Sequence, residues 1–231
     1  LLKRNLNKLN ANNLKKILVN NKIFLTIFGV IILFISYLSI PNIFNPNEIS
    51  VEIKKNLLNK LNLEFNFEKK LDYKFLPRPH FIVNKSSIKF NENEISDIKK
   101  IKIYVSLNNL FSLKNMRVKN IIIEEGSFNL NKNNYGFFVD LLDSNFKGLE
   151  VKIINSNIFY RNLQNEVLFV NNITNAKYIY DSDKSKNILY SKNKIFNLPY
   201  SLELYTDKKK IVNSKINIES LRLQIENQFL D

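Results

Sequence analysis

The sequence predicts a mainly β protein in which one N-terminal transmembrane helix and one amphipathic helix precede an antiparallel sheet. Three patterns support this fold class: positions 23–40 are apolar and uncharged, apolar residues recur every four positions over 46–61, and apolar and polar residues alternate from Leu63 onward. A period near 3.6 residues is typical of a helix, and a period of two is typical of a strand. The chain has 231 residues, which is enough for one or two domains after the apolar stretch.

The stretch 23–40 has the length and composition of a membrane anchor. As a helix it covers roughly 27 Å, and the hydrocarbon core of a bilayer is about 30 Å thick. It lacks the polar stripe that a helix packed on a soluble core usually shows. The apolar residues of the predicted anchor are Ile23, Phe24, Leu25, Ile27, Phe28, Val30, Ile31, Ile32, Leu33, Phe34, Ile35, Leu38 and Ile40.

The charges that flank the anchor predict its orientation. Lys and Arg residues but no acidic residue precede it, and no Lys or Arg occupies positions 41–53. The positive-inside rule therefore places residues 1–22 in the cytoplasm as a basic tail and residues 41–231 across the membrane. The alternative is a cleaved signal peptide, whose apolar core normally has only about 7 to 15 residues. The basic residues closest to the lipid headgroups would be Lys15, Lys16 and Lys22.

Positions 46–61 are predicted to form the amphipathic helix. Asn45 followed by Pro46 is typical of a helix N-terminus, because an Asn side chain caps backbone N–H groups and the first helical position needs no N–H. Glu48 in the first turn complements the helix dipole. The apolar positions expected to pack on the first strands are Ile49, Ile53, Leu57 and Leu61.

Alternation after Leu63 predicts a series of strands with one buried and one wet face, as in an antiparallel sheet. The clearest of them runs from Lys100 to Leu107. The predicted strands comprise residues 63–68, 71–75, 81–83, 87–90, 100–107, 118–123, 128–130, 149–153, 158–160, 167–170, 177–180, 200–205 and 216–225.

Polar segments between these strands are predicted to be turns. Residues 124–127 and 155–157 would close hairpins over 118–130 and 149–160, which share one plan about 30 residues apart. Asn84–Ser86 separates another predicted pair, and Asp181–Lys184 offers side chains that bond nearby backbone. The domains expected from this repeat are a unit of residues 46–143 and a second antiparallel unit of residues 144–231, which would begin a longer repeat.

A structural bend is predicted at Pro77, Arg78 and Pro79. Two prolines at alternate positions exclude a central strand, because each lacks a backbone N–H for the ladder. Arg78 is expected to pair with a carboxylate or a lipid phosphate. His80, the only histidine, is expected to serve packing or a turn rather than catalysis.

Composition and motifs argue against several classes of function. The absence of cysteine excludes disulfides and thiolate metal sites, and no cofactor site is expected. The net charge of +14 is spread along the chain and includes the basic tail, so nucleic-acid binding is not expected. Asp140 and Asp143 lack a base or metal partner, and the segment after Asp181 lacks the glycine of a calcium loop. The protein is therefore not expected to be an enzyme.

The apolar faces of the strands are predicted to line a groove that is open to acyl chains, because no long amphipathic helix follows Asp143 to cover them. Such a sheet must pack on another sheet, curl on itself or hold a ligand. The alternative is a curled sheet that is filled by its own side chains. The candidate groove residues are Ile101, Ile103, Val105, Leu107, Leu149, Val151 and Ile153, with Leu221, Leu223 and Ile225 in the last predicted strand.

The order of these features resembles the N-terminal region of the AsmA family. A basic flank, one membrane helix and an amphipathic helix precede Tyr73–Phe81, which contains the sequence Leu-Pro-Arg-Pro-His. The similarity continues through Ile101–Leu113, Val118–Leu130 and Tyr135–Phe138. It covers residues 20–145 well and residues 146–231 loosely.

The resemblance implies a single-pass inner-membrane protein of Gram-negative bacteria, with most of the chain in the periplasm and a role in outer-membrane biogenesis. Larger relatives build a curled β-groove whose apolar floor is thought to carry phospholipid between the membranes. The alternative function is a scaffold or regulator of outer-membrane protein assembly through protein contacts. Typical members are several hundred residues longer, so the chain is expected to be a short member or an N-terminal piece.

Overall fold

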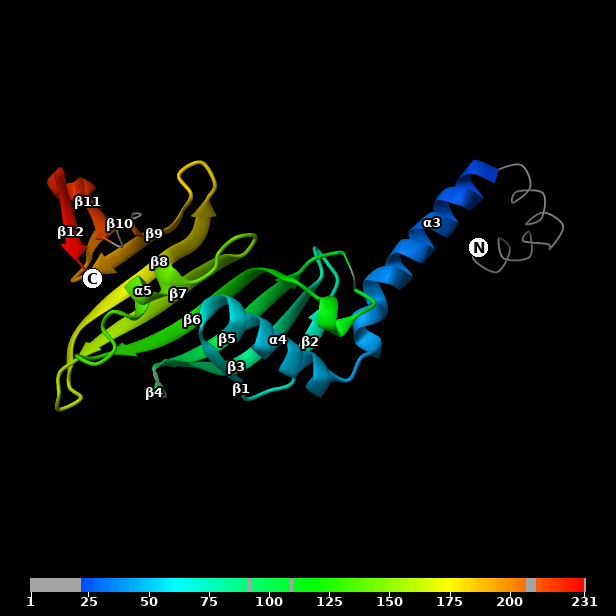
Figure 1. Ribbon diagram of the computed structural model, residues 1–231, viewed down its shortest axis with the longest axis horizontal. Helices are drawn as coiled ribbons and strands as arrows, with labels where there is room; N and C mark the ends of the chain where they lie inside the picture. Colours follow the sequence, from blue (N-terminus) through cyan, green and yellow to red (C-terminus); the bar gives the residue numbers. More distant parts are fainter. Residues whose placement is uncertain (1–21, 91–92, 109, 207–210, 231) are drawn as a thin grey trace, which may run out of the picture. The chain divides into compact units, whose positions relative to one another are not determined.

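The computed structural model describes residues 22–90, 93–108, 110–206 and 211–230, and its contacts divide the chain after Ile43 into two units (Figure 1). The first contains α3 (Lys22–Ser39) and the 3₁₀ turn η1 (Ile40–Ile43). The hydroxyls of Thr26 and Ser39 donate to carbonyls one turn earlier, so the helix satisfies these polar groups itself. The helical part of the unit is apolar and long enough to cross a membrane, as predicted, although Ile40 belongs to η1.

The second unit begins with α4 (Pro46–Leu61), which has the bounds predicted for the amphipathic helix. The Asn45 side chain accepts a hydrogen bond of 3.0 Å from the backbone N–H of Asn47 and caps the first turn. All four predicted apolar positions, Ile49, Ile53, Leu57 and Leu61, are buried. Asn62 ends the helix in the left-handed conformation.

The rest of this unit is one open, curled sheet. The described residues contribute twelve strands to this sheet. Ten of them follow the order β1-β3-β5-β6-β7-β8-β9-β10-β11-β12, and the short strands β2 and β4 pair with β3 outside this order. The strands are β1 (Glu64–Phe67), β2 (Asp72–Lys74), β3 (His80–Phe90), β4 (Asn93–Glu94), β5 (Ser96–Val105), β6 (Val118–Leu130), β7 (Glu150–Arg161), β8 (Val167–Asp181), β9 (Lys186–Ile195), β10 (Leu198–Thr206), β11 (Ile211–Ile218) and β12 (Leu223–Leu230). Short turns lie between them: η2 (Leu113–Asn115), α5 (Phe137–Asp140), η3 (Leu141–Asp143) and η4 (Glu219–Leu221).

One pair of neighbouring strands, β6 and β7, is parallel, which corrects the expectation of a fully antiparallel sheet. Their pairing joins residues thirty positions apart, from Asn120 with Glu150 to Leu130 with Tyr160. The repeat seen in the sequence is therefore real, but it consists of two parallel strands and not of two hairpins. The sheet continues across the predicted domain boundary at residues 143 and 144, because β6 and β7 lie on either side of it.

A crease runs across five neighbouring strands. In each, two consecutive residues that are not buried stand between buried ones, where strict alternation allows only one. The paired positions lie side by side in the register: Asn84–Lys85, Lys99–Lys100, Glu124–Glu125, Ile154–Asn155 and Thr174–Asn175. Lys85, Glu125 and Asn155 have φ values of 60°, 55° and 49°. Such bulges bend strands and increase twist, so the crease curls the sheet.

The crease explains three wrong turn predictions. Asn84–Ser86, the segment 124–127 and the segment 155–157 lie inside the continuous strands β3, β6 and β7, where they form the crease. Side chains that tolerate a positive φ are typical of turns and of bulges alike, so their local sequence does not distinguish the two.

Other strand bounds also differ from the prediction. Residues 167–170 and 177–180 belong to the single strand β8, and β9 was not predicted. The predicted strand 216–225 contains the end of β11, the turn η4 and the start of β12. The turn at Asp181–Lys184 is confirmed, because the Asp181 side chain accepts hydrogen bonds of 3.0 Å from the N–H groups of Asp183 and Lys184.

The core lies on the face of the sheet that α4 and the β6–β7 crossover cover, called here the inner face. The crossover spans residues 131–149 and buries Phe137, Leu141, Leu142, Phe146 and Leu149. It is tied to α4 by a hydrogen bond of 2.8 Å from the Asn145 N–H to the Lys60 carbonyl. The Tyr178 hydroxyl donates to the Phe138 carbonyl at 2.7 Å and ties the crossover to β8.

Candidate functional site

The structure places most of the predicted groove residues in this core. Ile101, Ile103, Val105, Leu149, Val151 and Ile153 are all buried, with at most 6% of any side chain exposed. Leu107 lies in the connection after β5 and not in a strand, and it is 47% exposed. The protein's own side chains therefore fill the inner face at these positions, as the alternative of a filled, curled sheet predicts. A ligand would need another part of the sheet.

The inner face of β10, β11 and β12 is only partly covered. Its side chains continue the inner face because Leu204 of β10 and Ser214 of β11 are buried partners in the register. Leu223 and Ile225 on β12 are 42% and 36% exposed, and the members on β10 and β11 are half-buried. We call this surface the apolar strip; it comprises Leu198, Tyr200, Leu202, Ile216, Ile218, Leu223 and Ile225.

The rows of the apolar strip run across the strands. Leu202 pairs with Ile216, which pairs in turn with Ile225, while Ile218 pairs with Leu223. Aliphatic side chains thus stand next to one another at the open edge of the sheet. An apolar surface that is continuous with the core but only partly covered is typical of a binding site.

Aromatic residues border the apolar strip toward the core. The rings of Tyr160 on β7 and Phe169 on β8 stack with centroids 4.3 Å apart. Burial, together with the nearby Tyr160, raises the pKa of Tyr200 to about 12, although a hydrogen bond from Asn171 opposes the shift. Burial also raises the pKa of Tyr160. Both phenols stay neutral at physiological pH, so Tyr200 within the strip and Tyr160 at its border carry no charge.

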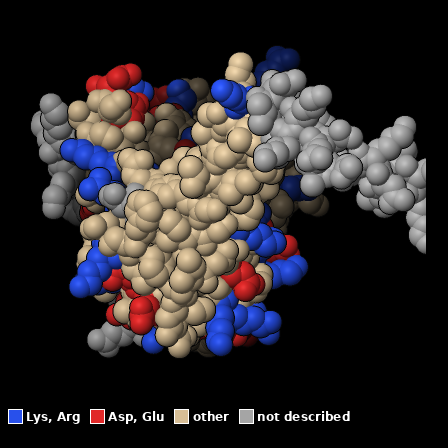
Figure 2. Space-filling view, turned by 90° about the vertical axis from the view of Figure 1, so that its right-hand side faces the viewer, with Lys and Arg blue, Asp and Glu red and all other residues tan. Residues whose placement is uncertain are grey.

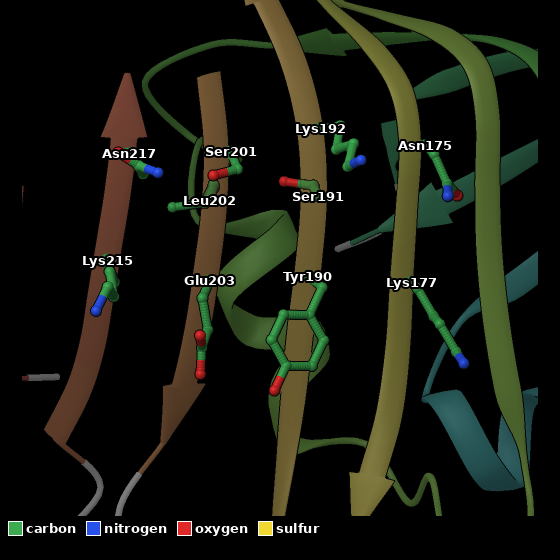
Figure 3. Close-up of a pocket in the computed structure, with 10 residues that line it drawn as sticks. All are labelled: Asn175, Lys177, Tyr190, Ser191, Lys192, Ser201, Leu202, Glu203, Lys215 and Asn217. Atoms are coloured by element: carbon green, nitrogen blue, oxygen red, sulfur yellow. The ribbon is translucent and has the colours of Figure 1, made fainter. Parts of the chain in front are cut away.

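The opposite, outer face of the same strands carries a hollow of about 350 Å³ (Figure 3). Lys177, Tyr190, Glu203 and Lys215 project from four neighbouring strands, β8 to β11, and α5 lies behind the sheet in this view. The other polar residues of the lining are Asn175, Ser191, Lys192, Ser201 and Asn217. The hollow mixes cations, a carboxylate and amides, so it favours no single ligand charge.

Charges on the outer face largely neutralise one another. Glu150 accepts ion pairs of 2.9 Å from both Lys152 and Lys177, and these lysines lower the pKa of its carboxyl group although burial opposes them. Lys102 pairs with Glu124 at 2.6 Å. Figure 2 shows a similar mixture of basic and acidic side chains around an uncharged area on one face of the structure. Because these charges are paired, the net positive charge of the chain is not concentrated on this face.

The predicted bend lies at the start of β3. The Leu76–Pro77 peptide bond is cis, and the Arg78 guanidinium lies 4.9 Å from the centroid of the Tyr104 ring. No ion pair of Arg78 with a carboxylate is found among the described residues, so the expected carboxylate partner is replaced by an aromatic one.

His80 has the structural role that the sequence predicts. It is buried, its ring stacks on Tyr104, and its Nδ1 lies 2.7 Å from the Arg78 carbonyl oxygen. Because His80 is a buried ring that stacks on Tyr104, replacing it by Ala is expected to lower the stability of the domain.

The described residues contain no group of three or more His, Cys, Asp or Glu side chains that could hold a metal ion. Asp140 ends α5 and Asp143 ends η3, on the crossover. Of the three predicted headgroup contacts, Lys22 is the first residue of α3, while Lys15 and Lys16 lie outside the described residues.

The sequence prediction missed most of the apolar strip. Alternation over 198–205 and 211–218 indicates two strands, but the alternation over 216–225 predicts a single strand where the structure has the end of β11, the turn η4 and the start of β12. The prediction of a single strand therefore omits η4, the turn that places Ile216 beside Ile225.

Comparison with known proteins gives one family. The sequence model of the AsmA family matches residues 15–147, which is more than half of the chain. No curated protein matches the sequence. The matched range contains α3, α4 and the strands from β1 to β6, and the apolar strip lies beyond it.

Proposed function

This chain belongs to the AsmA family, and we propose that it is a membrane-anchored envelope protein of outer-membrane biogenesis whose sheet provides an apolar surface for phospholipid transfer. In this proposal α3 crosses the inner membrane of a Gram-negative bacterium. Residues 1–22 are cytoplasmic and the β domain is periplasmic. The basic residues before α3 and the uncharged connection after it support this orientation.

One observation carries the transfer proposal: the apolar strip is an extension of the core that nothing in the described chain covers completely. Acyl chains gain free energy when they leave water for such a surface. Tyr200 within the strip and Tyr160 at its border are neutral phenols, so they introduce no charge. Residues deeper in the sheet, such as Val105 and Val151, support the surface but do not contact the lipid.

Photo-crosslinking in cells tests the proposal. A photoreactive residue at Ile218 or Ile225 is expected to capture phospholipid, because both side chains belong to the apolar strip. Asn217 and Gln224 are matched controls, since they are strand neighbours that point to the outer face and pair with each other in the register. Absence of lipid from both strip positions, in a protein that accumulates normally, would contradict lipid transfer at this surface.

A second candidate, a scaffold for other envelope proteins, is favoured by the edge strand β12. In the described residues β12 pairs only with β11, and it contains no Pro, Lys or Arg to deter another strand. Protein adducts at Glu226 and Gln228, without lipid at Ile225, would favour this function. Neither candidate assigns a reaction to the protein.

A further inference from the structure

Three large apolar side chains are exposed at one end of the strands. Leu76 lies in the β2–β3 connection, and Leu107 and Phe111 lie in the β5–β6 connection; they are 68%, 47% and 66% exposed. A backbone hydrogen bond of 3.1 Å from the N–H of Val105, the last residue of β5, to the Pro79 carbonyl ties the start of the β5–β6 connection to the β2–β3 connection. The apolar side chains therefore come from adjoining parts of the fold.

Basic side chains accompany these apolar residues. Arg78, Lys114, Arg117 and Lys119 are all exposed, and residues 73–79 and 105–119 contain no Asp or Glu. None of the four is in an ion pair found among the described residues. Burial lowers the pKa of the neighbouring Lys60, and the charges of Lys119 and Arg117 lower it further. Positive charge thus accumulates here, in contrast to the paired charges of the outer face.

A bilayer surface fits this combination better than a protein does. Lysine is depleted in protein interfaces, whereas exposed aliphatic and aromatic side chains among cations are typical of segments that enter the headgroup region of anionic membranes. The chain also passes from η1 to α4 through only Phe44 and Asn45. A membrane crossed by α3 would therefore lie within reach of the β domain.

We propose that this end of the β domain docks on an anionic bilayer surface, with Leu76, Leu107 and Phe111 among the headgroups and Arg78, Lys114 and Arg117 against lipid phosphates. The docking surface is separate from the apolar strip and does not depend on lipid transfer. It holds the domain to the membrane at a second point in addition to α3.

The absence of tryptophan from the sequence allows a direct test. The full chain with Phe111→Trp is reconstituted in vesicles of phosphatidylglycerol and phosphatidylcholine, in which part of the phosphatidylcholine carries bromine on its acyl chains. Insertion is expected to shift the Trp emission to the blue and to quench it. Phe196→Trp is the matched control, because Phe196 is 81% exposed in the β9–β10 turn and lies in a different connection; its emission should stay unquenched.

Charge is tested in the Phe111→Trp background. Lys114→Gln with Arg117→Gln should reduce the quenching, as should vesicles of phosphatidylcholine alone or added salt. Circular dichroism of each variant confirms that it is folded. Quenching of Phe111→Trp no greater than that of Phe196→Trp would overturn the docking proposal. Quenching that is insensitive to both charge and lipid composition would overturn the role of the basic residues.

Discussion

The hydroxyl oxygen of Ser156 accepts a hydrogen bond of 2.9 Å from the backbone N–H of Gly126, thirty residues earlier in the chain. The same hydroxyl donates to the Ile154 carbonyl at 3.0 Å. Both bonds lie at the crease, next to the positive-φ residues Glu125 and Asn155. The buried Ser156 side chain thus satisfies the Gly126 N–H, which has no backbone partner in the distorted hydrogen-bond ladder.

Ser156→Ala is expected to destabilise the β domain. The substitution leaves the buried Gly126 N–H without its acceptor, which costs about 1–3 kcal/mol. Urea unfolding of the purified protein measures the difference. Ser220→Ala, an exposed serine in η4, is the control and should not change stability measurably. Equal stabilities of the two variants would show that the Ser156 bond contributes nothing.

The conformation of Glu125 predicts that a Gly variant is more stable than a Val variant at this position. Its φ of 55° is unfavourable for any L-residue and worst for a β-branched one. Glu125→Val should therefore cost at least about 1–2 kcal/mol, whereas Glu125→Gly should be nearly neutral. Thermal unfolding followed by circular dichroism compares them. A Val variant as stable as the Gly variant would mean that the crease does not require this conformation.

A negative charge is expected to have different effects in the core and on the apolar strip. Val105→Glu places a carboxylate in the buried core, so it is expected to unfold the domain. Ile225→Glu introduces the same group on a partly exposed strand and should change stability by roughly 0.5 kcal/mol or less. Only the second variant should remain folded and lose lipid crosslinking at Ile218. Retained crosslinking in the folded Ile225→Glu protein would argue against transfer along the strip.

The free energy of unfolding should fall at high pH, because the buried phenol of Tyr200 ionises there. Its pKa is raised from about 10 to about 12 in the folded protein, so the folded state favours the neutral phenol. The resulting stabilisation is complete below pH about 10 and is lost as the pH rises toward about 12. Tyr200→Phe should weaken this decline, as measured by urea unfolding between these pH values. Tyr205→Phe on the same strand is a control, since it should leave the decline intact.

Local sequence was sufficient for some parts of the fold. Asn45, Pro46 and the apolar positions from Ile49 to Leu61 predicted α4 with its observed bounds, because capping and amphipathic spacing act within the helix itself. The apolar residues of β5 were assigned to the inner face for a similar reason, since alternation alone decides which side chains share a face.

Long-range arrangement was not predictable in the same way. Asn155 and its neighbours are as suitable for a turn as for a bulge, and only the pairing of β7 with β6 and β8 selects the bulge. The burial of Val151 depends on the crossover, whose Phe146 and Leu142 have no helical or strand period that indicates where they pack. The sequence therefore could not decide between an open and a filled inner face at Val151, because the covering of a sheet by an irregular segment has no sequence signature.

The parallel pairing of β6 with β7 also determines how the sheet can change in size. After the crossover, each strand from β8 to β12 pairs with the strand before it, and none of these described strands pairs with β1 to β6. Whole hairpins can therefore be gained or lost at the β12 edge without rethreading the chain or repacking the interior. The length of the sheet can in this sense change by whole hairpins while the N-terminal half of the sequence stays unaltered.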